Sequence, residues 1–249
     1  MVFRFDIIYE YREMFFYGAL FTLGISLIST VFGTFLGLFF ALARIIRIEK
    51  GGWPMRALAW VLRQISLIYV TLFRGTPLFV QIFIWYYVWF PILIHPTDGL
   101  IISGEQALEL RRNYGAVITG ILALSVNSGA YITEIFRGGI QSIDRGQFEA
   151  ARSLGLSYTQ AMRYIILPQA IHRMLPPIGN EFITLLKDSS LLSAIAVAEL
   201  AFAARTAAGR YLNYETPWYT IALIYLVMTI ALSWFFSWLE KKYNKSYRH

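Results

Sequence analysis

Six polar side chains interrupt apolar stretches of the sequence, which makes them the candidates for chemistry. They are Arg74, Thr76, Asn127, Ser128, Glu181 and Asp188. If those stretches cross a bilayer, a charge at its centre costs about 2.5–3.5 kcal/mol on the translocon-based scale. Ionisable groups at such depth usually face a water-filled path or pair with one another. The pattern therefore predicts a polar path for a small zwitterionic or charged solute.

Two of these charges also have a purely structural explanation, which the sequence leaves open. Lys187 precedes Asp188 and can neutralise it locally, and Arg74 can cap a helix end while its head group reaches the membrane interface. Pro77 favours a real interruption, since a continuous helix through it would lose a backbone hydrogen bond. Discontinuous helices occur at membrane depth where the backbone lines a cavity or is buried in protein.

Signatures of covalent, metal or nucleotide chemistry are missing from the sequence. It contains no G-x-x-x-x-G-K-[ST] phosphate loop, no H-E-x-x-H and no G-x-S-x-G. It has no cysteine, which excludes a disulfide framework and a cysteine-based metal site. The histidines, His95, His172 and His249, are far apart along the chain. We therefore expect no enzyme activity, no metal site and no ATP binding in this chain.

The composition is that of a membrane protein. Hydrophobic residues make up 57% of the chain and charged residues 15%, against roughly 45–50% and 25% in soluble domains. The formal charge of +7 raises the question of nucleic acid, but the basic residues are scattered between apolar runs. That distribution is typical of the positive-inside bias of membrane proteins. We expect membrane lipid, and no nucleic acid, around this chain.

Five apolar runs are long enough to cross a bilayer. They cover residues 15–43, 65–90, 114–136, 169–200 and 218–238. The second run is interrupted at residues 74–77, and the fourth is expected to be a broken span with charges inside it. Residues 91–113 are expected to form a loop or a short amphipathic segment outside the lipid. Gly33 and Gly37 have the spacing that lets another helix approach closely, most simply within the same subunit.

A polar stretch separates the third and fourth expected spans. Its first part, residues 147–154, is rich in helix formers but too short to be a stable helix alone. Gly155 stands where a helix end favours positive φ, and Ser157 with Gln160 has the capping-box spacing that opens a second helix. At Pro168 that helix must end, kink or lead into another. We predict a helix–turn–helix projection that is held in water for contact with another protein.

Basic residues give an expected orientation. If the loop after the first span faces the cytoplasm, most Lys and Arg residues outside the spans fall on the cytoplasmic side. Five spans then place the N-terminus outside, the C-terminus inside and the projection in the cytoplasm.

The projection resembles the EAA loop of bacterial ABC-importer permease subunits. The residues that carry this pattern are Glu149, Ala150, Ala151, Gly155, Ile165, Leu167 and Pro168. Further motifs, at residues 74–78, 131–138, 146–147 and 187–191, are similar to the polar amino acid branch of the family, which comprises histidine, glutamine, glutamate, arginine and opine permeases. The similarity covers about residues 15–240. Residues 91–113 fit no motif and make a longer outer loop than the family requires.

The resemblance implies a fold and a contact surface. The fold is that of type I ABC importer permeases, an all-α polytopic membrane protein with five transmembrane helices. A single permease domain would cover residues 1–249, with the cytoplasmic coupling loop at residues 138–168. The coupling helix would dock into a groove on a separate ATPase subunit. The implied ATPase-coupling residues are Gln147, Glu149, Ala150, Ala151, Gly155 and Leu156.

The resemblance also implies partners and a location. Two copies of an ABC ATPase subunit would bind ATP and Mg, so that this chain carries no cofactor of its own. A second permease subunit, identical or homologous, would complete the path, and an extracytoplasmic amino-acid-binding protein would deliver the solute. The location would be the bacterial cytoplasmic (inner) membrane. The alternatives are an ABC permease for another small solute, and a membrane channel or scaffold without ATP coupling. Which amino acid is moved stays open at this point.

Overall fold

The computed structural model describes residues 3–45 and 52–244 of the chain. These residues are almost entirely helical, with an isolated bridge between Ile94 and Ile102. The α-helices are α1 (Phe5–Ile45), α2 (Trp53–Gly75), α3 (Leu78–Ile84), α4 (Phe90–Leu93), α5 (Gly104–Gln141), α6 (Arg145–Ser153), α7 (Tyr158–Ala161), α8 (Leu167–Asp188), α9 (Leu200–Tyr211) and α10 (Glu215–Asn244). The π-helical turns are η1 (Trp85–Trp89) and η2 (Met162–Ile166), and η3 (Ser189–Ile195) is a 3-10 helix.

Within the described residues, four helices, α1, α2, α5 and α10, are long and apolar enough to cross a membrane. A fifth crossing results when the helical run Tyr158–Ile195 and the following Leu200–Tyr211, which are bent by 46° at a short break, count as one span. The predicted all-α, multi-span architecture is therefore confirmed, and the bent pair brings the number of candidate spans to five.

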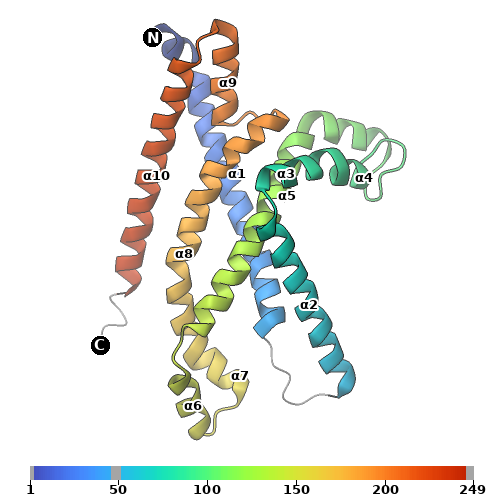
Figure 1. The fold of residues 1–249 in the computed structure, drawn as a ribbon, viewed down its shortest axis with the longest axis vertical. Helices are drawn as coiled ribbons and strands as arrows, with labels where there is room; N and C mark the ends of the chain where they lie inside the picture. The colour runs from blue at the N-terminus through green and yellow to red at the C-terminus, as the bar shows by residue number, and fades with distance from the viewer. Residues whose placement is uncertain (1–2, 46–51, 245–249) are drawn as a thin grey trace.

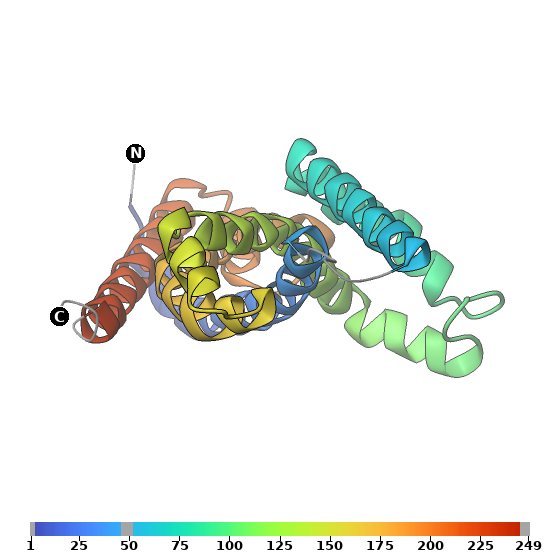
Figure 2. The same ribbon diagram turned by 90° about the horizontal axis from the view of Figure 1, so that it is seen from below.

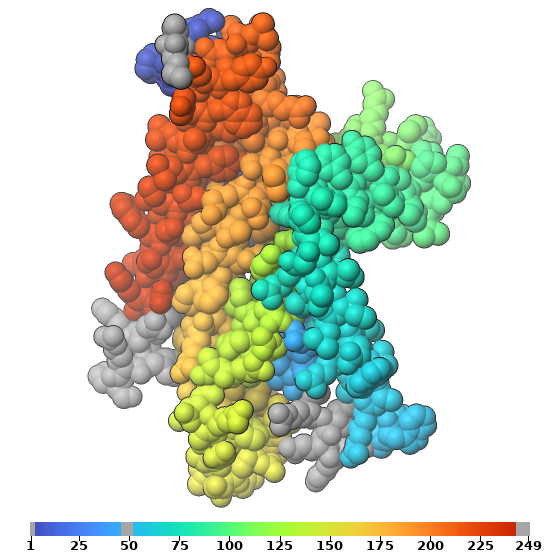
Figure 3. All heavy atoms as spheres, viewed as in Figure 1, coloured from blue at the N-terminus to red at the C-terminus, as the bar shows by residue number. Residues whose placement is uncertain are grey.

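The helices are arranged between two ends of an elongated molecule. Figure 1 shows the N-terminus and α9 at one end, and α6 and α7 at the other. Seen from below, α2, α3, α4 and the beginning of α5 lie to one side of the remaining helices (Figure 2). The space-filling view shows the same division on one face of the molecule (Figure 3).

The centre of the fold is the pairing of α1 with α5, which is the most extensive helix contact in the described chain. A Cβ atom added at Gly33 would lie 3.2 Å from the backbone of Ser125 and Gly129. One added at Gly37 would lie 2.6 Å from Ile132 Cγ2. The expected use of this glycine pair, close packing within the same subunit, is therefore confirmed.

The boundaries expected for the second span are wrong. Its helix begins at Trp53, twelve residues before the expected start, because Pro54 occupies the first turn, where a missing N–H costs nothing. Arg56 and Arg63, which stand between the first two expected spans, are exposed on α2. The helix ends at Gly75, and α3, η1 and α4 form a separate, shorter apolar segment.

Residues 91–113 and the fourth span also differ in part from expectation. Only the middle of residues 91–113 is a loop, because α5 begins at Gly104 and its charged first turns extend beyond the expected span. The α8 helix continues through Pro176 and Pro177. The break in the fourth span comes later, at η3 and at Ala196, whose φ is +60°. The last expected span lies within α10.

Candidate coupling and translocation sites

The projection, which we define as α6, α7 and the turn between them, begins at a side-chain cap. Asp144 Oδ1 accepts a hydrogen bond of 2.6 Å from the backbone N–H of Gly146 and so caps α6. The sequence-based helix started at residue 147, two residues late, because this Asp was not read as a cap. The signal was present, since Asp is among the preferred N-cap residues.

The turn of the projection has the conformation that its sequence predicts. Gly155 has φ +83°, and the N–H of Leu156 donates to Ala151 O at 3.1 Å. This is the hydrogen-bond pattern of a Schellman-type helix end. Ser157 and Gln160 form the reciprocal capping box, with bonds of 2.8 and 3.3 Å. The predicted helix, tight turn and second helix are therefore confirmed.

One face of α6 is packed and the other is free. Ala151 is buried and Phe148 is half-buried, with its ring 5.5 Å from that of Tyr158. Phe148 also packs on a buried cluster that includes Ile166 and Met174. The packed face gives a short helix the tertiary support that it needs.

The predicted coupling residues divide between these two faces. Gln147, Glu149, Ala150 and Gly155 are exposed, Ala151 is buried and Leu156 is half-buried. Leu154, which was not among them, is 81% exposed at the tip of the projection. The projection is thus a folded element whose exposed surface carries both polar and apolar side chains. A protein partner can bind a surface of this kind.

An ionic brace joins the end of α1 to α5, the helix that leads into the projection. Glu134 on α5 forms an ion pair with Arg44 at the end of α1, and a second pair with Arg137 at 2.5 Å. The side chains of Arg44 and Glu134 are only 17% and 18% exposed. Glu134, a charge inside the third expected span, is thus used to connect α1 and α5.

The break between α2 and α3 brings two of the predicted solute-path residues together. Thr76 Oγ1 donates to Leu72 O at 2.7 Å. Asn127 Nδ2 donates to Phe73 O at 3.1 Å and to Gln81 Oε1 at 2.9 Å. Both residues therefore bond to the broken helix. Gln81, which lies at the centre of these bonds, was not predicted.

The four remaining solute-path residues lie around the same break, on α2, α5 and α8. The guanidinium of Arg74 lies 5.1 Å from the ring centre of Tyr131. The carboxyl of Glu181 lies within electrostatic range of Arg74 and Asp188, and the buried Ser128 hydroxyl has no hydrogen-bond partner among the described residues. The structure thus gathers opposite charges in one region, as a path for a zwitterion requires. Contact of these residues with a solute stays a prediction.

Glu199 is a second buried polar residue that the sequence reasoning missed. It is fully buried, it caps α9 by accepting from the N–H groups of Ala201 and Phe202 at 2.8 and 2.7 Å, and it accepts from Tyr225 Oη at 3.0 Å. Backbone N–H groups and a hydroxyl stabilise a buried carboxylate. A Glu directly before an apolar run was the available signal, since it marks a helix start.

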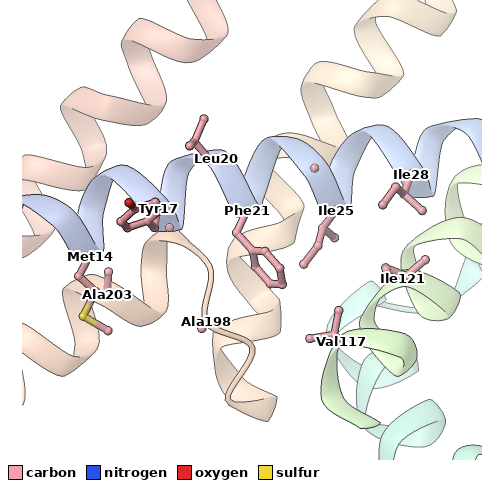
Figure 4. Close-up of a pocket in the computed structure, with 12 residues that line it drawn as sticks. Met14, Tyr17, Leu20, Phe21, Ile25, Ile28, Val117, Ile121, Ala198 and Ala203 are labelled. Atoms are coloured by element: carbon pink, nitrogen blue, oxygen red, sulfur yellow. The ribbon is translucent and has the colours of Figure 1, made fainter. Parts of the chain in front are cut away.

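An apolar cavity of about 720 Å³ lies elsewhere, along α1 (Figure 4). Side chains of α1, such as Phe21 and Ile25, line it together with Val117 and Ile121 of α5. No charged side chain lines it. The cavity does not suit a polar solute, so we place the candidate path at the charged break instead.

Comparison with known proteins decides the family. The model of the family described as "Binding-protein-dependent transport system inner membrane component" matches residues 33–245. The chain belongs to this family. The match covers the projection and all the spans except the first part of α1, so the resemblance based on the EAA pattern is confirmed.

Individual relatives of this permease are similar over nearly its whole length. The glutamine transport system permease protein of Escherichia coli (strain K12) is 36% identical over 226 residues, which cover 90% of each chain. A probable amino-acid ABC transporter permease protein of Bacillus subtilis (strain 168) is 39% identical over 90% of this chain and 86% of the relative. A crystal structure of an amino acid ABC transporter with histidines superposes with a TM-score of 0.79, at 35% identity, and covers 97% of this chain and all of that one.

These similarities define the permease at the level of the family. The chain is a multi-pass membrane subunit of a binding-protein-dependent ABC transporter, and its fold is that of ABC importer permeases. Membership implies an ATPase partner and a solute-binding partner, and it favours a translocating rather than a catalytic subunit.

Proposed function

We propose that this chain is the translocating subunit of an importer that moves polar amino acids across the bacterial cytoplasmic membrane. The names of its relatives, which are glutamine and amino-acid permeases, support the class of solute. The charged break supports it physically, because Arg74 and Glu181 offer opposite charges to the carboxylate and ammonium of a zwitterion. The solute-path residues proposed in this role are Arg74, Thr76, Asn127, Ser128, Glu181 and Asp188.

The observation that carries the proposal is the projection with its free face. We propose that two ATPase subunits bind ATP and Mg and grip the projections of two permease chains, identical or homologous. Their closure on ATP would push on residues 147–156, and the path would change from inward-facing to outward-facing. The chain itself would hydrolyse nothing. An extracytoplasmic amino-acid-binding protein would load the outward-facing state.

The proposed topology places the N-terminus outside and the C-terminus inside, with the projection in the cytoplasm. Arg56 and Arg63 on α2 support it, because the start of α2 lies toward the same end as α6 and α7 (Figure 1). The chain would act as a single domain over residues 1–249, with its coupling loop at residues 138–168.

The test is ATP-driven uptake of radiolabelled amino acids by the complete complex in liposomes. We expect Glu149→Ala, on the free face of α6, to lower ATP-driven uptake by at least about tenfold, the loss of one good contact in a protein interface. Gly155→Val should do the same, because a β-branched residue is strained at φ +83°. Both variants should still insert into the membrane.

Thr206→Ala is the control, since Thr206 is exposed on α9 at the opposite end. Normal uptake by both coupling variants would refute the proposed role of the projection.

A further inference from the structure

The break between α2 and α3 leaves a backbone carbonyl without its normal partner. In a continuous helix, Phe73 C=O would accept a hydrogen bond from the N–H four residues later. That residue is Pro77, which has no N–H. Lipid offers no hydrogen-bond donor, so protein groups or water in the path must fill the vacancy.

Two side-chain amides fill it. Gln81 Nε2 donates to Phe73 O at 2.9 Å, to Thr76 O at 3.0 Å and to Thr76 Oγ1 at 2.9 Å. Asn127 Nδ2, from α5, donates to the same Phe73 O at 3.1 Å and to Gln81 Oε1 at 2.9 Å. Gln81 is 5% exposed and Asn127 6%. These five bonds tie α2, α3 and α5 together at one point.

The bonds also constrain the residue that follows the carbonyl. The peptide group is planar, so fixing Phe73 C=O fixes the orientation from which Arg74 begins. Arg74 lies over the Tyr131 ring and within electrostatic reach of Glu181. A shift of the break would therefore move one of the two charges on which the candidate path depends.

We propose that Gln81 and Asn127, together called the amide clamp, are positioning residues that hold the α2–α3 break in one geometry and thereby place Arg74 opposite Glu181. This rests on the proposed function in one respect, that Arg74 serves the solute path. The clamp gives Asn127 a different task from the solute contact predicted for it, because both of its amide hydrogens are used within the protein.

The first experiment measures the geometry of the break without any transport. The chain has no cysteine, so introduced cysteines can be spin-labelled selectively within it. Ile68→Cys and Val88→Cys are both exposed and stand on opposite sides of the break. Labels at these two positions report the distance across the break in the complete complex. In the otherwise unchanged chain we expect a single, narrow distribution of distances. In Gln81→Met the distribution should be broad or shifted, because this change keeps the length and apolar volume of the side chain but removes its amide. Gln169→Met is the matched control, because Gln169 Nε2 donates to Ile165 O, one turn earlier in the same continuous helical run, and so ties no separate helix to it. An unchanged distribution in Gln81→Met would overturn the proposal.

The second experiment asks whether the geometry matters for the solute. We expect Gln81→Met to raise the apparent KM of uptake about tenfold, and Asn127→Ala, which leaves the three bonds donated by Gln81, about threefold. If Gln81→Met does not fold, Asn127→Ala carries both experiments. A lower Tm with KM unchanged in these variants would show that the amides only support the fold, and would overturn the positioning role.

A third variant separates support from positioning. Pro77→Ala supplies the missing N–H to Phe73 O. In combination with Gln81→Met, it should therefore restore the Tm of the complex. The apparent KM of uptake should stay raised, because a straightened helix moves Arg74. Recovery of both quantities would contradict the proposal. A complex that shows no ATP-driven amino acid uptake in any variant would refute the proposed function instead, and the spin-label distances would still decide whether the clamp sets the break.

Discussion

Single residues set how closely α1 and α5 approach each other. Gly37 meets the fully buried Ile132, and a Cβ atom there would lie 2.6 Å from Ile132 Cγ2 and 2.8 Å from its Cβ. Gly24, on the same helix, has no heavy atom within 4 Å of the corresponding position. One glycine is thus required by packing, and the other is not.

We therefore expect Gly37→Ala to lower the free energy of unfolding by about 1–3 kcal/mol, the usual cost of an overpacked contact. The matched change Gly24→Ala should leave it unchanged or raise it by up to about 1 kcal/mol, because Ala favours a helix interior more than Gly does. Thermal unfolding of the purified chain in detergent measures both. Equal shifts of Tm in the two variants would contradict the close contact.

Residues in local motifs could be predicted from the sequence, whereas residues defined by tertiary contacts could not. Gly155 and Ser157 were identified correctly because a helix end and a capping box involve only neighbours along the chain. Gln81 and Glu199 were missed because an amide or carboxylate in an apolar run does not reveal its partner. The sequence located the helix break at Pro77, but the donors that stabilise it come from α3 and from α5, 46 residues beyond Gln81.

At the scale of elements, Pro91 and Pro168 distort the helical run without ending it, in contrast to the break at Pro77. Both π-helical turns stand two residues before a proline: η1 before Pro91 and η2 before Pro168. Each proline then occupies the first turn of the next helix, where its missing N–H is tolerated. Of the three outcomes predicted at Pro168, the structure shows direct continuation into α8. The sequence could not choose among them, because π-turns have no composition of their own.

The brace formed by Arg44, Glu134 and Arg137 connects the end of α1 to α5, the span that leads into the projection. We expect Glu134→Gln to lower the free energy of unfolding by about 1.5–3 kcal/mol, the value of a hydrogen bond to a charged group in a largely buried site. Amino acid uptake per ATP hydrolysed should fall as well, because the ends of α1 and α5 would no longer move together. Thermal unfolding and the ratio of uptake to hydrolysis measure the two effects.

An exposed ion pair is the control for the brace. Asp6 pairs with Arg4 at 2.6 Å, with side chains 61% and 39% exposed. Asp6→Asn should leave both quantities nearly unchanged, since exposed pairs contribute little. If Glu134→Gln behaves like Asp6→Asn, the brace has no part in coupling.

At the scale of the whole molecule, the chain alone leaves much apolar surface uncovered. Only 6% of the most apolar window of α10, and 17% of that of α2, is buried within the chain. Lipid and a second permease are the proposed cover for these faces. Composition predicted the membrane from this apolar content, but it could not say which faces pack inside the chain, because every span is apolar on most sides.

The orientation of the molecule follows from its two ends. The loop that contains Leu100 lies toward the end of the molecule that holds the N-terminus and α9, and Leu100 is 76% exposed. The α7 helix, which contains the exposed Thr159, lies at the opposite end (Figure 1). Since the chain has no cysteine, single substitutions can be labelled with a membrane-impermeant maleimide. We expect Leu100→Cys to react in spheroplasts, and Thr159→Cys only in inside-out vesicles, because the basic residues near α2 hold that end in the cytoplasm. The reverse pattern would place the projection outside, where no ATPase could reach it, and would contradict the proposed topology and the coupling role together.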